Sequence, residues 1–129
     1  MKWLLQDPVR EAGTGKAVRL MQSIASGGQP VLQPPHWLAE VAAVLTRESP
    51  DTAAEDAAML CAMELPVADD PVILARSCEL AVELKQHVFD TYYHAVALET
   101  EAAILVTADE RYLRAARKKG RILYVSDWE

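Results

Sequence analysis

The sequence has few of the residues that stabilise small secreted domains or anchor proteins in membranes. It contains only two cysteines, Cys61 and Cys78, and their separation matches no common zinc or redox spacing. We therefore expect reduced thiols in the core and a reducing compartment. No apolar run approaches the roughly 20 residues of a membrane-spanning helix, and the apolar start is too short for a secretory signal. These absences favour a cytoplasmic protein without membrane contact.

Positive charge is also scarce, since 13 lysines and arginines face 19 acidic residues, for a net charge of -6. Such a protein repels nucleic acid at long range, so contact with a polyanion needs a local basic patch, a bound cation or a basic partner. The candidate patch lies near the end of the chain, where Lys119 and Arg121 accompany four candidate RNA-binding residues: Arg111, Arg114, Arg117 and Lys118. A solvated helical end with cations near its negative dipole explains this cluster nearly as well.

Two common enzyme signatures are missing. The segment from Gly13 to Lys16 reads G-T-G-K, but a phosphate loop would need glycine in place of Arg10 and a hydroxyl residue in place of Ala17. No serine or cysteine lies in a nucleophile-elbow pattern, and none of the three histidines has an evident catalytic companion. Nucleotide binding through a phosphate loop and serine or cysteine hydrolysis are therefore poor interpretations.

Hydrophobic residues make up 51% of the 129 positions, enough for one domain spanning 1–129 with a core of its own. Helical periodicity alternates with short apolar runs, which favours an α/β fold with a parallel sheet. The expected helices are 11–26, 35–45, one ending near 63, 71–85, 90–102 and 110–119; the expected strands are 30–34, 65–68, 104–107 and 122–125.

Three acidic residues lie at the edges of apolar segments: Glu40, Asp90 and Asp109. Asp109 follows the carboxyl end of the 104–107 strand, where open α/β sheets bind ligands. Several carboxylates in one cleft cannot all stay ionised without a cation between them, so the pattern suggests a metal site. Taken singly, Asp109 and Asp90 could each serve only to start a helix, and Glu40 could be a satisfied, half-buried helix residue.

The segments around these acids resemble the PIN domain, the nuclease fold of many VapC-type toxins. They read P-P-H-W-L-A-E-V-A-A-V-L, F-D-T-Y-Y-H-A-V-A-L-E and L-V-T-A-D-E-R-Y-L, and the closing L-Y-V-S-D-W resembles the last strand of the family. The resemblance implies a parallel sheet sandwiched by helices and a metal-dependent endoribonuclease. Glu40, Asp90 and Asp109 would be the catalytic residues that hold Mg²⁺ or Mn²⁺, and Thr107 would be ancillary. It also implies an antitoxin partner and a homodimer.

His94 lies one helical turn after Asp90, and it could contact the metal-bound water or the RNA. A structural or surface role is the alternative for this histidine.

The first motif of the family, a strand ending in aspartate, has no match in the sequence. Residues 1–5 resemble the middle of the helix that follows that strand, and Asp7 lies too far along to be assumed as a replacement. We therefore expect either a start assigned too late, at an internal methionine, or an N-terminally truncated domain, with the first central strand missing or replaced. Its slot would be filled by the N-terminal residues, by a neighbouring subunit or by a rearranged sheet. Loss of one acid would weaken metal binding, so a non-catalytic module that binds RNA or protein is the alternative function.

Overall fold

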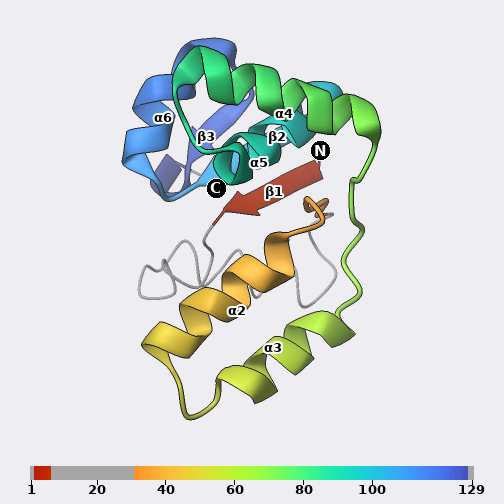
Figure 1. Cartoon of the computed structure of the whole chain (residues 1–129), viewed down its shortest axis with the longest axis vertical. Coiled ribbons are helices and arrows are strands. Elements are labelled where there is room, and N and C mark those ends of the chain that lie inside the picture. Colours follow the sequence, from red (N-terminus) through yellow and green to blue (C-terminus); the bar gives the residue numbers. More distant parts are fainter. Residues whose placement is uncertain (1, 7–30, 128–129) are drawn as a thin grey trace.

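The computed structural model describes residues 2–6 and 31–127, and it has the expected α/β character (Figure 1). The predicted helix at 11–26 and the glycine-rich G-T-G-K segment lie outside these residues. None of the helices in 2–6 and 31–127 is both long enough and apolar enough to cross a bilayer. In chain order the elements are β1 (Lys2–Gln6), α2 (Trp37–Glu48), α3 (Ala53–Ala62), α4 (Pro71–Leu84), α5 (Val88–Glu99), β2 (Ala103–Thr107), α6 (Glu110–Ala116), a 3-10 turn (Arg117–Lys119), β3 (Ile122–Tyr124) and a second 3-10 turn (Val125–Asp127).

The three strands form a parallel sheet in the order β1-β2-β3. Thr107 at the end of β2 pairs with Gln6 at the end of β1 and with Tyr124 at the end of β3. All three strands therefore finish at one edge of the sheet. The expected strands at 104–107 and 122–125 correspond to β2 and β3 and are confirmed.

The other two expected strands are wrong as sheet strands in the part of the chain that is described. Segments 31–34 and 65–68 meet only at the isolated parallel bridge between Gln33 and Val67. The Gln33 N–H donates to the Pro66 carbonyl at 3.0 Å, and the Ala68 N–H donates to the Gln33 carbonyl at 2.8 Å. In this pattern the next N–H donors would be those of residues 66 and 35, and both residues are prolines without an N–H, so the pair cannot extend into a full ladder.

Strand β1 corrects the expectation for the start of the chain. We expected residues 1–5 to belong to a helix, but Lys2–Gln6 is extended and pairs with β2 along its whole length. A short apolar run is compatible with either structure, and the N–H and C=O groups along the edge of β2 require partners. Of the three ways to fill the slot beside β2, the chain uses its own N-terminal residues. Asp7 follows β1 directly in sequence and lies outside the described residues.

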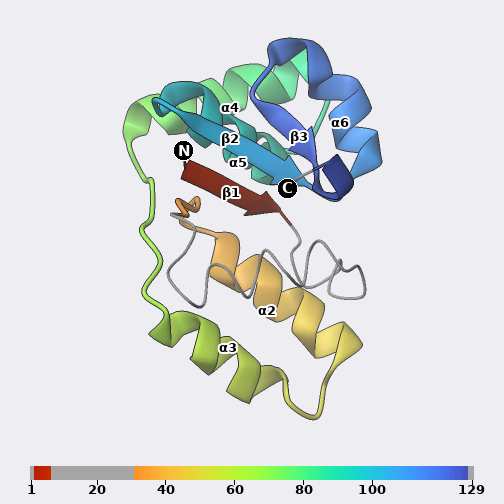
Figure 2. The same cartoon turned by 180° about the vertical axis from the view of Figure 1, so that it is seen from behind.

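Helix α5 packs on β1 and β2, and α4 lies on the outer side of α5 (Figures 1 and 2). Every residue of α5 from Thr91 to Ala97 is buried, so the middle of this helix is enclosed on all sides, whereas Phe89 in its first turn is exposed. The small side chains of Ala95 and Ala97 allow neighbouring elements to approach closely. Helix α6 packs beside β3. The expected sandwich is thus met in part, as a small parallel sheet with helices packed against it.

Helices α2 and α3 form a hairpin that lies beyond the β1 edge of the sheet in both views (Figures 1 and 2). The apolar stripe predicted for α2 is confirmed, because its buried residues are Trp37, Val41, Val44 and Leu45. The helix begins at Trp37, two residues later than expected. An extended segment at 63–70 connects this hairpin to α4.

Both cysteines are free, as expected, but the prediction that they lie in the core is wrong. Cys61 is exposed near the end of α3, and Cys78 is exposed on α4 immediately after the buried Ser77. An apolar helical stretch predicts burial only for one face, and Cys78 lies beside that face rather than on it.

Asp70 is the N-cap of α4, and its side chain accepts a hydrogen bond from the Val72 N–H at 2.8 Å. We expect Asp70→Ala to lower the free energy of unfolding by about 1 kcal/mol, because the first turn loses this acceptor. Urea denaturation of the variant measures the change. Asp69→Ala is the matched control, since it removes an exposed carboxylate one residue before the cap. Equal losses in the two variants would contradict the capping role.

Candidate metal and RNA site

Asp109 is held at the carboxyl edge of the sheet by two hydrogen bonds. Its Oδ1 accepts from the Tyr112 N–H at 3.0 Å, and its own N–H donates to the Thr107 Oγ1 at 3.0 Å. Thr107, which we expected to be ancillary, is fully buried at the end of β2. The helix-capping interpretation of Asp109 is therefore confirmed, and the cap also fixes where its carboxylate lies.

Asp90 lies in the first turn of α5, and its N–H donates to the His87 carbonyl at 3.0 Å. Asp90 and Asp109 share one pocket of about 400 Å³, which is lined by Lys85, Gln86, His87, Asp90, Asp109 and Arg111. The pocket collects residues from the end of α4, the start of α5 and the start of α6. The structure thus brings together two of the three predicted acids.

Both carboxylates of the pocket affect the pKa of Tyr112. Burial raises the pKa of its hydroxyl well above the usual 10, and the negative charges of Asp90 and Asp109 raise it further. The phenol therefore stays protonated at every physiological pH. Its hydroxyl lies 3.0 Å from the Nδ1 of His94 and can act as the donor in that hydrogen bond.

His94 is fully buried and is not among the residues that line the pocket. Its Nε2 lies 2.8 Å from the Gly120 carbonyl, which can only accept, so we assign the proton to Nε2 and leave Nδ1 to accept from Tyr112. Burial lowers the pKa of His94; the bond to Gly120 opposes this, and the charges of Arg76 and Lys119 add to it. The structure thus places His94 in the core.

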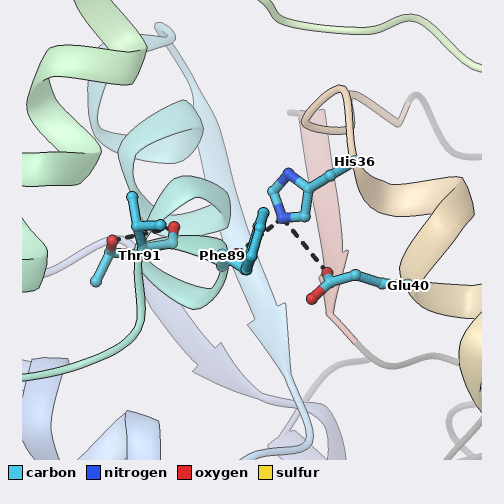
Figure 3. A network of polar contacts seen from close by, with 5 residues as sticks. His36, Glu40, Phe89 and Thr91 are labelled. Atoms are coloured by element: carbon cyan, nitrogen blue, oxygen red, sulfur yellow. Dashed lines mark hydrogen bonds and ion pairs between the residues drawn. The ribbon is translucent and has the colours of Figure 1, made fainter.

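Glu40 lies elsewhere, on α2 (Figure 3). The Nε2 of His36 is 3.4 Å from the Glu40 Oε1 and 2.9 Å from the Phe89 carbonyl, so Glu40 is linked to the residue before Asp90. Burial lowers the pKa of His36, and its bond to Phe89 opposes that effect.

Glu40 is not part of the lining of the acidic pocket. Within residues 2–6 and 31–127, no three His, Cys, Asp or Glu side chains are grouped so that they could hold a metal ion. Helical spacing correctly placed Glu40 beside the buried stripe of α2, but it does not specify which neighbouring element that side of the helix meets. The metal-binding and catalytic roles of the three acids remain predictions.

The four predicted RNA-binding residues are all exposed. Arg111 lines the acidic pocket, whereas Arg114 and Arg117 line a second hollow of about 280 Å³ with Glu110, Tyr124 and other residues. Lys118 lies on the 3-10 turn after α6. Two other cations of the basic stretch have structural partners.

Lys119 pairs with Glu83 of α4. Arg121 donates to the Thr100 carbonyl at 2.8 Å and to the Ala97 carbonyl at 3.1 Å, which satisfies the end of α5. Of the basic stretch, only Arg111 lines the acidic pocket.

Sequence reasoning missed Lys85, Gln86 and His87 as pocket residues. A usable signal was present, because Gln86 and His87 form the break between two predicted helices immediately before Asp90, and Lys85 is the last residue of the first of these helices. A tight connection into a helix shares the rim of any site formed at the start of that helix.

Two carboxylates in one pocket suit a hard divalent cation. Mg²⁺ commonly keeps several waters and is bound through one or two carboxylates plus substrate phosphate oxygens. Asp90 and Asp109, which line the same pocket, supply these anionic oxygens. The donor set present in the pocket therefore fits Mg²⁺ or Mn²⁺.

Comparison with known protein families identifies the fold. The PIN domain family matches residues 9–118, which is most of the chain. A search of curated proteins found no match. PIN domains are in general metal-dependent nucleases, consistent with the acidic pair and its basic neighbours at the edge of the sheet. By this match over most of its length, the chain belongs to the PIN domain family.

Proposed function

We propose that this protein is a metal-dependent endoribonuclease that hydrolyses RNA phosphodiesters through Mg²⁺ or Mn²⁺. The observation that carries the proposal is the pocket in which Asp90 and Asp109 lie together with the cationic side chains of Lys85 and Arg111. Such a pocket offers anionic oxygens to a divalent cation and positive charge to a polyanion. Each of them favours RNA binding in a protein whose net charge of -6 opposes it.

In this proposal Asp90 and Asp109 hold the ion, which when bound would acidify a water molecule and offset the charge that develops on phosphorus. The role of the protein is to hold these two carboxylates in place. Thr107 and the Tyr112 N–H fix Asp109, and Asp90 lies in the first turn of α5, directly before the buried part of that helix. Glu40 remains a candidate third acid, linked to the start of α5 through His36.

The test is cleavage of a mixed-sequence RNA by the purified full chain. We expect cleavage with Mn²⁺ or Mg²⁺, none above buffer with EDTA, and recovery when the ion is restored in excess. Products should carry a 5′-phosphate and a 3′-hydroxyl. Cleavage that persists in EDTA would contradict the proposal. Glu40→Gln tests the third acid, and Asp7→Asn tests whether the residue after β1 serves as the missing first one.

A second candidate is a non-catalytic module that binds RNA or protein. It is favoured by the absence of a three-residue acidic group within the described residues. This candidate predicts RNA binding that does not depend on divalent ions and no cleavage under any of the conditions above.

We extend the proposal to a VapC-type toxin with an antitoxin partner and a homodimeric state. The support is the resemblance of the segments around Glu40, Asp90 and Asp109 to that group. Expression of the active protein should then arrest growth, and expression of Asp109→Asn should not. Sedimentation of the purified chain tests the homodimer.

A further inference from the structure

The acidic pocket has a cation on each of two different elements. Lys85 comes from the C-cap of α4, and Arg111 comes from the first turn of α6. The two carboxylates come from α5 and from the N-cap of α6. The pocket therefore combines the charges needed for a divalent ion with positive charge from two separate parts of the fold.

Lys85 has a left-handed backbone conformation, which glycine adopts more readily than other residues. Its φ is 55° and its ψ is 48°, in the left-handed region that every residue with a Cβ disfavours. The N–H groups of Lys85 and Gln86 both donate to the Ala81 carbonyl, the latter at 3.1 Å, which closes α4 in the manner typical of a glycine cap. Lys85 also lines the pocket, so the residue that ends α4 in this conformation brings a cationic side chain to the pocket rim.

We infer that Lys85 and Arg111 form a phosphate clamp, and that the substrate is a polynucleotide with phosphates on both sides of the cleaved linkage. This inference rests on the proposed function. The acids and their ion would take the scissile phosphate. The ammonium and guanidinium groups would then take its neighbours, because both groups match phosphate oxygens and neither can share the position of the ion. A diester with a single phosphate cannot use the clamp.

The test measures binding without cleavage. A 5′-labelled, mixed-sequence oligoribonucleotide is titrated with the full chain in EDTA at several salt concentrations, and fluorescence anisotropy gives the association constant. Each lost phosphate contact on a single strand reduces the slope of log K against log salt by about 0.7. We expect this reduction for Lys85→Gly and for Arg111→Ala, and about twice as much for the double variant.

Lys85→Gly both relieves a left-handed backbone conformation and removes a cation, and each of these changes has its own control variant. Ala102→Gly relieves another left-handed residue, with φ 59°, outside the pocket, and Arg47→Ala removes an exposed cation at the end of α2. Neither should alter the salt slope. Because glycine suits the backbone at position 85, Lys85→Gly should fold, and its melting temperature verifies this. A lysine that only complements the helix dipole would change melting and leave the slope unaltered.

Cleavage assays separate this inference from the function on which it rests. With Mn²⁺, Lys85→Gly should raise the KM for RNA several-fold, and its effect on the KM for bis(p-nitrophenyl) phosphate, which has a single phosphate, should be much smaller. An unaltered salt slope in both single variants would overturn the clamp even if the wild type cleaves RNA. Reduced slopes without any ion-dependent cleavage would support the clamp and overturn the nuclease. A wild type that binds no RNA would overturn both.

Discussion

Asp109→Asn is expected to reduce ion-dependent RNA cleavage by about 100-fold or more while leaving the stability of the fold nearly unchanged. Asparagine caps helices as well as aspartate does, so its side-chain oxygen can still accept from the Tyr112 N–H. What it cannot supply is the negative charge that a hard cation needs. The substitution therefore separates the capping role of Asp109, which the structure shows, from its proposed role as a metal ligand.

Three companion variants complete this test. Asp90→Asn should reduce cleavage to a similar extent, because Asp90 lies in the same pocket. Asp109→Ala should lose cleavage and also about 1 kcal/mol of stability, since the cap is removed. Glu110→Gln removes an exposed carboxylate from the next residue and should leave cleavage unchanged. Initial rates with saturating Mn²⁺ and urea unfolding give the two readouts. Wild-type rates in both Asp→Asn variants would refute the metal site.

The parts of the fold that could be predicted from sequence are those determined by local patterns. The run from Ile104 to Thr107 is rich in β-formers and reads as a buried strand, and Asp70-Pro71 marks a helix start that the structure confirms. The position of Asp109 after a strand end followed from the same reasoning. Such features depend on neighbours within a few residues, so they can be predicted from short stretches of the sequence.

The features that could not be predicted from sequence share a different cause. Trp3-Leu4-Leu5 is too short for periodicity to distinguish helix from strand, and its partner β2 lies about a hundred residues away in sequence. The surroundings of Glu40 depend on how the α2–α3 hairpin meets the start of α5 through His36 and Phe89. Which residues face a common pocket is a property of packing between elements. The spacing of residues within one helix cannot specify it.

The prediction for His94 from sequence was limited for the same reason. Substitution of this residue is also the second change with a large expected effect, here on stability. Its position after Asp90 suggested a site residue, but its partners are Tyr112 and Gly120, which lie 18 and 26 residues further on. We expect His94→Leu to lower the free energy of unfolding by about 3 kcal/mol. Leucine keeps much of the apolar volume but leaves the buried Tyr112 hydroxyl without this partner, at a cost of about 1–3 kcal/mol. It also removes the hydrogen bond to the carbonyl of the exposed Gly120, which is worth about 1 kcal/mol.

His94→Gln distinguishes these hydrogen bonds from the packing of the ring. A glutamine amide has one oxygen that accepts and one NH₂ that donates, so it can serve both Tyr112 and Gly120. It should recover most of the stability lost in the leucine variant. Urea unfolding of the three proteins at pH 8 gives the comparison. Equal losses in the glutamine and leucine variants would show that ring packing, rather than the hydrogen bonds, determines the effect.

The same histidine should make the stability depend on pH. Its folded pKa is lowered by burial and by the nearby charges of Arg76 and Lys119, so the unfolded chain binds a proton more readily than the folded one. Stability is therefore complete above the unfolded pKa of about 6.5 and falls as the pH drops from there toward the folded pKa, by at most about 1.4 kcal/mol per pH unit.

His36, whose pKa is lowered for the same main reason, adds to this slope. Unfolding measured between pH 8 and pH 5 should show the fall in the wild type and a shallower fall in His94→Gln, which cannot take up the proton. His87→Gln is the control, because it replaces an exposed histidine at the N-cap of α5. An unaltered slope in His94→Gln would mean that His94 takes up its proton equally well in the folded protein. The neutral imidazole assigned between Tyr112 and Gly120 would then be incorrect.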